Sequence, residues 1–289
     1  MGLPTENEVK PMKFKLVTDS SANLRSIRED IDFQSVPLTI RVEDREFVDD
    51  ETLDLDDMLE TLATTKSKSS SSCPNVEDYL KAFGDADRVF CITITSNLSG
   101  SFNAARLAKE EYEATYPDRK VYVIDSLSAG PELKLIAHRI LEMIKSSAIY
   151  EDICKKIVEY QEKTHLIFCL ESMKNLANNG RVSPLVAKLA GVLGIRAIGK
   201  ASDVGTLEML DKVRGEKGAV AKIFEHMQAM GYKGGKVLID NCCNLPAAKA
   251  LQELVLNKFP KAQVIHDTCK GLCSFYAEKG GLMVGFEVV

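Results

Sequence analysis

The sequence predicts an α/β protein of two domains, the first built on a parallel sheet and the second on a smaller mixed sheet. Two observations favour this class. In the first half, short β-rich runs alternate with helical patterns, and repeated strand, turn and helix indicate a parallel sheet with helices on both faces. The length of 289 residues also fits two domains of about 100–150 residues each better than a single core.

In the first half, the elements follow one another in the order that a parallel sheet requires. β-rich runs predict strands, and apolar residues at helical spacing predict helices. We expect strands at 14–18, 88–94 and 121–124, and helices at 101–115, 132–144 and 151–162. The serine-rich stretch 64–74 has the composition of a flexible loop. We place this domain at residues 12–162.

The second half, residues 163–289, repeats strands and helices with glycine-rich punctuation between them. It predicts a smaller α/β layer with a mixed sheet, and a ligand would lie between the two domains. Strands are expected at 166–170, 196–198, 206–210, 236–240, 262–266 and 282–288, and helices at 184–193 and 247–259.

Composition argues against several classes of protein. The 37 Lys and Arg against 42 Asp and Glu give a net charge of −5, which weakens any case for nucleic-acid binding. Eight irregularly spaced cysteines in a chain of this size indicate free thiols in a reducing compartment. No basic and apolar leader begins the sequence, and no apolar run approaches the ~20 residues needed to span a bilayer, so we expect a cytoplasmic protein.

Hydroxyl side chains follow three of the predicted strands, at Ser20, Ser99 and Ser126. Ligands of open α/β sheets bind beyond the carboxyl ends of the strands. Ser99, Gly100 and Ser101 also open a helix, where unpaired N–H groups and the helix dipole favour an anion. A carboxylate or phosphate could be held there by these amides and hydroxyls. The alternative interpretation is an ordinary serine N-cap.

Other chemistries find little support. The Ser99 segment is not Gly-x-Ser-x-Gly, and the four histidines include no clearly matched base, so we assign no catalytic residue. The spacing from His266 to Cys269 and Cys273 matches no usual zinc pattern, and no phosphate-binding glycine motif is present, so we expect neither a metal nor a cofactor. Arg181 follows an Asn-Asn-Gly turn and is either a surface residue or a guanidinium presented to a phosphate or a partner.

Taken in order, several blocks resemble the DegV family over nearly the whole chain. The blocks are Val17–Ser21, Ser71–Asn75, Ile94–Ala105, Val123–Ser126, Leu176–Ser183 and Leu193–Ile198. The resemblance implies a bacterial protein with a three-layer α/β/α N-terminal domain and a two-layer second domain. It also implies that one long-chain fatty acid is held between them, with its carboxylate bound by hydroxyls and amides and its tail in an apolar tunnel.

The resemblance also assigns roles to individual residues. Ser71 matches the hydroxyl position of the loop motif, Ser99 and Gly100 match the carboxylate-binding turn, and Arg181 matches an arginine that faces a partner kinase. Some members are the binding subunits of a fatty acid kinase, whose separate ATP-binding subunit phosphorylates the bound carboxyl group. The resemblance therefore implies a lipid carrier and not an enzyme, with transient membrane contact allowed and the oligomeric state left open.

The last loop departs from the family pattern His-x-Gly-Pro-Gly. Asp267 takes the place of the histidine near the carboxylate, His266 lies beside it, and a shift of one residue would restore His266. A charged Asp267 facing the ligand would repel it, unless the side chain points away or is protonated. Two alternatives therefore stay open: an enzyme acting on a small carboxylated or phosphorylated substrate at the Ser99 helix, and a lipid-sensing regulatory module that binds a partner through Arg181.

Overall fold

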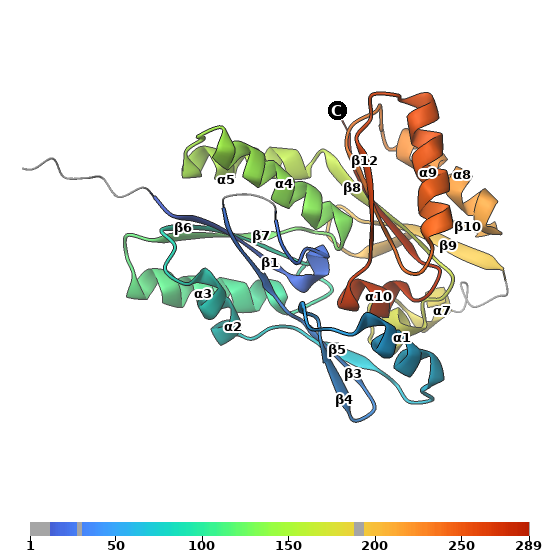
Figure 1. Cartoon of the computed structure of the whole chain (residues 1–289), viewed down its shortest axis with the longest axis horizontal. Helices are drawn as coiled ribbons and strands as arrows, with labels where there is room; N and C mark the ends of the chain where they lie inside the picture. Colours follow the sequence, from blue (N-terminus) through green and yellow to red (C-terminus); the bar gives the residue numbers. More distant parts are fainter. Residues whose placement is uncertain (1–11, 28–30, 188–193, 289) are drawn as a thin grey trace, which may run out of the picture.

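The computed structural model describes residues 12–27, 31–187 and 194–288 and shows an α/β protein (Figure 1). In chain order the first half contains β1 (Phe14–Asp19), the short 3-10 helix η1 (Ser20–Ala22), β2 (Asp32–Val36), β3 (Thr39–Val42), β4 (Arg45–Val48), α1 (Leu55–Thr64), β5 (Ser70–Ser72), α2 (Val76–Phe83), β6 (Arg88–Thr93), α3 (Ser101–Thr115), β7 (Lys120–Asp125), α4 (Pro131–Lys145) and α5 (Tyr150–Gln161). The second half contains β8 (Thr164–Leu170), α6 (Lys174–Asn178), α7 (Pro184–Ala187), β9 (Ile195–Ala201), β10 (Leu207–Arg214), α8 (Glu216–Ala229), β11 (Val237–Asn241), α9 (Leu245–Lys258), β12 (Val264–Thr268), α10 (Gly271–Ala277) and β13 (Leu282–Glu287).

The first half is built on a four-stranded parallel sheet with the order β2-β1-β6-β7. Its central strands are apolar on both faces, as parallel strands covered by helices must be. Figure 1 shows α4 and α5 on one face of this sheet and α2 and α3 on the other. Leu16 and Ile92 pack with α4 and α5, whereas Val17 and Cys91 pack with α2 and α3. The predicted three-layer α/β/α arrangement is confirmed.

The second half is built on a mixed sheet with the order β10-β9-β8-β13-β11-β12, in which only β11 and β12 run parallel. Side chains of β8 alternate between its two faces, as the period of a strand requires. Ile167 and Cys169 join the core under α8 and α9, whereas Leu166, Phe168 and Leu170 face α10. The predicted mixed sheet is confirmed, and its second face is turned toward the first half.

A third, antiparallel sheet with the order β4-β3-β5 was not predicted. Residues 70–72 of the serine-rich stretch form its edge strand, with Ser71 opposite Ile40, so the prediction of a flexible loop is wrong there. The partner strand lies about thirty residues earlier, and its backbone pairing leaves no signature in a run of serines. Of the helix predicted at 184–193, the structure describes α7; residues 188–193 lie outside the described part of the chain.

Helix α4 joins the two halves. Lys134 on α4 pairs with Asp240 on β11 at 2.6 Å, and Asn23 donates to the same carboxylate at 2.6 Å, with all three side chains buried. The predicted boundary between residues 162 and 163 falls between α5 and β8 and stays a prediction. No described helix has both the length and the apolar character that crossing a membrane requires.

The close approach of α4 to β13 requires a glycine at position 285. A Cβ there would lie 2.7 Å from the Pro131 carbonyl carbon and 2.8 Å from the Glu132 nitrogen, and both are backbone atoms. We expect Gly285→Ala to lower the free energy of unfolding by about 1–3 kcal/mol, measured by urea denaturation. In the control variant Gly218→Ala, on the outer helix α8, the new Cβ would approach one side-chain atom of Val213 on β10, at 2.8 Å, and no backbone atom, so the loss of stability should be smaller. Equal stability of the Gly285 variant and the wild type would contradict this packing.

Candidate functional site

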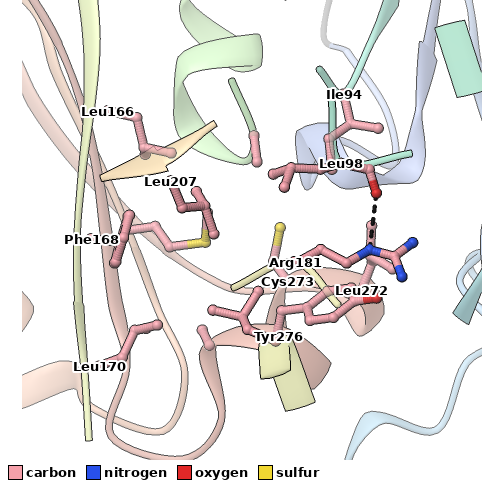
Figure 2. A pocket seen from close by; sticks show the side chains of 14 residues that line it. Ile94, Leu98, Leu166, Phe168, Leu170, Arg181, Leu207, Leu272, Cys273 and Tyr276 are labelled. Carbon is pink, nitrogen blue, oxygen red and sulfur yellow. Dashed lines mark hydrogen bonds between the residues drawn. The ribbon is translucent and has the colours of Figure 1, made fainter. Parts of the chain in front are cut away.

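An apolar pocket lies between the two halves of the chain (Figure 2). Leu166, Phe168 and Leu170 of β8 form one wall, and Ile94 and Leu98 form the opposite wall. The remaining lining residues come from α4's leading loop, α6 and its following turn, β10, α10 and β13: Ala129, Leu176, Arg181, Leu207, Leu272, Cys273, Tyr276, Ala277 and Met283. The cavity volume is about 70 Å³, so the pocket is small as well as apolar.

A second pocket of about 230 Å³, with several serines in its wall, adjoins it. Five residues line both pockets: Ile94, Leu98, Arg181, Leu272 and Tyr276. The residues that line only the second pocket are Leu38, Ser71, Ser72, Cys73, Ser99 and Gly100. Because the two pockets share these walls, they form one site with a hydroxyl-rich mouth and an apolar interior. We call the second pocket the mouth.

Helix α3 begins at the mouth. Its first residue is Ser101, and Gly100 in the N-cap position supplies no side-chain cap. Ser99 Oγ accepts from the Ser101 amide at 3.2 Å and lies 3.1 Å from Ser101 Oγ. Ser99 lines the mouth, whereas Ser101 is completely buried behind it. The start of α3 therefore lies beside the mouth, which Ser99 and Gly100 line, and the Ser101 amide is bonded to Ser99 Oγ.

A buried carboxylate, Asp19 at the end of β1, lies behind this turn. It accepts from the Ile94 amide at 2.9 Å and from the amide and hydroxyl of Ser21. Burial raises the pKa of Asp19 to about 6, while hydrogen bonds from Ser21, Ile94 and Ser101 act in the opposite direction. Asp19 thus links β1, the segment after β6 and the start of α3 beneath the mouth.

On the other side of the mouth, Ser71 on β5 meets α10. Its Oγ lies 2.8 Å from the hydroxyl of Tyr276, and either atom can donate. Arg181, half-buried, donates from Nε to the Leu98 carbonyl at 3.0 Å, which ties the turn after α6 to the Leu98 loop (Figure 2). Serine hydroxyls and one guanidinium therefore surround the same space. The predicted residues Ser71, Ser99, Gly100 and Arg181 meet here.

Ser20 and Ser126 lie elsewhere and have structural contacts. Ser20 is buried, and its Oγ accepts from the Leu38 amide at 3.0 Å. Ser126 is also buried, and its Oγ donates to the Ser128 carbonyl at 3.0 Å and accepts from the Ser128 amide. Neither of them lines the pocket or the mouth. Ser20 contributes indirectly, because its hydroxyl bonds the amide of Leu38, which lines the mouth.

His266 and Asp267, on β12, are likewise not brought to the site, and neither lines the pocket or the mouth. Asp267 lies 3.5 Å from Lys134 and 3.6 Å from Lys270. Partial burial raises its pKa, but these lysines and the Thr268 amide outweigh burial, and the pKa of Asp267 lies below its ordinary value. Asp267 is therefore held as an ion at the edge of the contact between the halves.

Sequence reasoning missed α10, which supplies Leu272, Cys273, Tyr276 and Ala277 to the pocket. The carboxylate of Asp49 accepts from the Gly271 amide at 2.7 Å and from the Leu272 amide at 2.9 Å, which caps the helix. A Cβ on Gly271 would lie 2.5 Å from that carboxylate. This pairing leaves no local signal in the sequence, because Asp49 and Gly271 lie 222 residues apart.

The chemistry that the site offers is donation of hydrogen bonds to an anion. All four histidines lie in the described part of the chain, and none of them lines the pocket or the mouth. Across the described residues, no group of three or more His, Cys, Asp and Glu is placed to hold a metal ion. An amphiphile with one small anionic head and an apolar tail matches the polarity of this site.

Comparisons with known proteins agree over nearly the whole length. A family model described as "Uncharacterised protein, DegV family" matches residues 13–288. A DegV domain-containing protein of Streptococcus pneumoniae is 43% identical over 280 residues, covering 96% of this chain and 100% of the relative. Among solved structures, the Fatty Acid Kinase (Fak) B3 protein of S. pneumoniae, loaded with linoleic acid, has a TM-score of 0.95 and 43% identity, covering 96% of this chain and 100% of that one. A DegV family protein of Eubacterium eligens, loaded with heptadecanoic acid, has a TM-score of 0.93 and 39% identity, with the same coverage.

The raised pKa of Asp19 makes stability depend on pH. The unfolded chain binds this proton only below its ordinary pKa of 3.8, whereas the folded chain keeps it up to about pH 6. Between these values the folded state holds more protons, so the free energy of unfolding falls as pH rises, by up to about 3 kcal/mol from this group. Urea denaturation at pH 4 and pH 7 should show a smaller fall in Asp19→Asn than in the wild type. The same fall in both proteins would contradict the assignment to Asp19.

Proposed function

The chain belongs to the DegV family, and we propose that it binds one long-chain fatty acid between its two halves. The tail lies in the apolar pocket, and the carboxylate lies at the mouth. The observation that carries this proposal is a small pocket with leucine and phenylalanine walls that shares five residues with a serine-lined mouth. Two similar proteins, at 43% and 39% identity, have been solved with linoleic and heptadecanoic acid, which supports this class of ligand.

The tail supplies most of the affinity in this proposal. Each buried methylene contributes about 0.8 kcal/mol, so the contribution grows with every carbon that enters the pocket. Met283 lines this pocket and can adapt its shape to the tail, because methionine has three rotatable bonds and no branch.

The head group needs donors, because burying an unpaired carboxylate is too costly to allow binding. Ser71 and Ser99 offer hydroxyls, and the first turn of α3 offers amides and the positive end of a helix dipole. Arg181 adds positive charge at the wall shared by pocket and mouth. All of these groups bind the carboxylate without reacting with it, which suits a carrier.

We further propose that the bound carboxyl group is presented to a separate ATP-dependent kinase subunit, which converts it to an acyl phosphate. Support comes from the similarity to a protein named as part of a fatty acid kinase. Arg181 is half-buried at the mouth, where a docking partner would reach both this residue and the head group. The chain itself is the non-catalytic binding subunit, and transient membrane contact would let it collect its ligand.

The enzyme alternative needs a base beside Ser99. Hydrolysis or acyl transfer by a serine requires an oriented histidine or an equivalent base within hydrogen-bond reach. Among the described residues that line the mouth there is no histidine, aspartate or glutamate. The carrier is therefore the better supported function.

Mass spectrometry of small molecules extracted from freshly purified protein tests the proposal directly. We expect a long-chain fatty acid at a ratio near one per chain, and its identity would give the preferred length and unsaturation. Protein that is empty as purified and stays empty after incubation with palmitate and with oleate would overturn the proposal.

The serine hydroxyls can be tested by substitution. If both help to hold the carboxylate, directly or through a neighbouring hydroxyl, Ser71→Ala combined with Ser99→Ala should weaken palmitate binding by roughly 2–5 kcal/mol, from the range for hydrogen bonds to charged groups. Titration calorimetry would measure the change. Ser67→Ala is the matched control, because Ser67 is exposed and lies outside pocket and mouth. Unchanged affinity in the double variant would place the head group elsewhere.

A further inference from the structure

We propose that the hydroxyl of Tyr276 donates a hydrogen bond directly to the fatty-acid carboxylate, with the Ser71 hydroxyl supporting it from behind. Tyr276 then takes the place beside the head group that the family pattern gives to a histidine of the last loop. In this chain the corresponding residues are His266 and Asp267. This inference rests on the proposed fatty-acid binding and names a donor that the serine-containing motifs do not include.

The position of Tyr276 is the first reason. Its ring lines the apolar pocket (Figure 2), and Tyr276 is one of the five residues that also line the mouth. A fatty acid has one point at which the apolar tail gives way to the anionic head, and that point must lie where the two pockets join. Tyrosine has an apolar ring and a polar tip and matches such a junction.

The pairing with Ser71 is the second reason. The two hydroxyl oxygens lie 2.8 Å apart, so the Tyr276 hydroxyl already stands at the group that the family motif assigns to the carboxylate. A phenol has one proton to donate, and its oxygen can accept another. When Ser71 donates to Tyr276, the Tyr276 proton is free to point at the ligand. The two hydroxyls then form a chain in which each hydrogen bond strengthens the next.

Tyr276 can donate at neutral pH because it keeps its proton. Burial raises its pKa above the ordinary value, and this outweighs Ser71 and the positive charge of Arg181, which both lower it. A carboxylate in the mouth would favour the protonated phenol further, because a second negative charge beside it is unfavourable. Bonds from a hydroxyl to a charged acceptor are stronger than those between neutral groups.

The ring is also held in place. The Asp49 cap fixes the first turn of α10, and Asn175 donates to the Phe275 carbonyl at 2.8 Å. The Phe275 and Tyr276 rings make an edge-to-face contact with their centroids 4.7 Å apart. The hydroxyl is therefore positioned before the ligand arrives, which reduces the entropy lost on binding.

The last loop does not compete for this role. Asp267 faces Lys134 and Lys270 and keeps its negative charge, so placing it beside a carboxylate would add repulsion. His266 is half-buried on β12 and lines neither pocket nor mouth. The departure of this loop from the family pattern is thus compatible with binding, because the missing donor comes from α10.

Tyr276→Phe tests the inference, because it removes one oxygen and keeps the ring. Calorimetry with the full chain should show palmitate affinity falling between about tenfold and about 100-fold. The uncharged 1-hexadecanol should lose several-fold less, and its retained binding shows that the variant is folded with its tail pocket intact. Equal losses for both ligands would mean that the hydroxyl acts through packing and would overturn the role at the carboxylate.

The relay from Ser71 is tested by adding Ser71→Ala to Tyr276→Phe. If Ser71 acts through Tyr276, the second change should cause no further loss of palmitate affinity. Losses that multiply would show that Ser71 contacts the ligand independently and would overturn the relay. Tyr232→Phe is the matched control, because its hydroxyl donates to the Gly235 carbonyl at 2.9 Å, away from pocket and mouth.

The outcomes separate this inference from the proposed function. Wild-type protein that binds palmitate, together with a Tyr276→Phe variant of equal affinity, would overturn the role of Tyr276 and leave the carrier function in place. Wild-type protein that binds neither palmitate nor oleate would overturn the carrier function and the inference with it.

Discussion

The site depends on one buried carboxylate, Asp49, which follows the β3–β4 hairpin and caps α10. It accepts from two successive amides at the start of that helix and pairs with Arg25, so a residue early in the chain fixes an element near its end. Removing one partner of such a buried pair leaves the other uncompensated, which is why the arrangement tolerates little change. Helix α10 in turn supplies Leu272 and Tyr276 to both pocket and mouth. The Asp49 cap therefore holds in place residues that line both the apolar pocket and the mouth.

Three of the four strands of the parallel sheet and the helices α3, α4 and α5 were predictable because their signals are local, whereas β2 and α1 were not predicted. Apolar runs and helical spacing located α3 and β6 to within a residue or two, since each element buries a whole face or both faces. The small antiparallel sheet was not predictable in the same way. Strand β5 consists of three serines, and its existence depends on backbone pairing with β3. The composition of this segment indicated a flexible loop, but its backbone pairs with β3 in the folded protein and holds it as a strand.

The residues of the candidate site also differ in whether local sequence could predict them. Ser71, Ser99, Gly100 and Arg181 were found from motifs, and the structure brings them together around the mouth. His266 and Asp267 were chosen by register in the last loop, but the charges that decide the place of Asp267 are lysines of α4 and of the loop before α10. Tyr276 could not be found from sequence, because its partner Ser71 lies 205 residues away and α10 is a short helix that begins at a glycine.

The chemistry of the mouth is consistent with the proposed role of the chain as a carrier of fatty acids. Affinity can come from the tail, because each methylene adds a similar increment without any demand on geometry. The head group then needs only enough hydrogen bonds to offset its desolvation. Hydroxyls and amides meet that requirement while leaving the carboxylate oxygens charged and nucleophilic, as phosphorylation by a partner would demand. A buried acid directly facing the head group would weaken binding by repulsion, and Asp19 avoids this because it lies behind Ser101, with its negative charge directed to the Ile94 and Ser21 amides. In the proposed carrier, burial of the tail thus provides the affinity, whereas the hydroxyl and amide donors leave the carboxylate oxygens able to react.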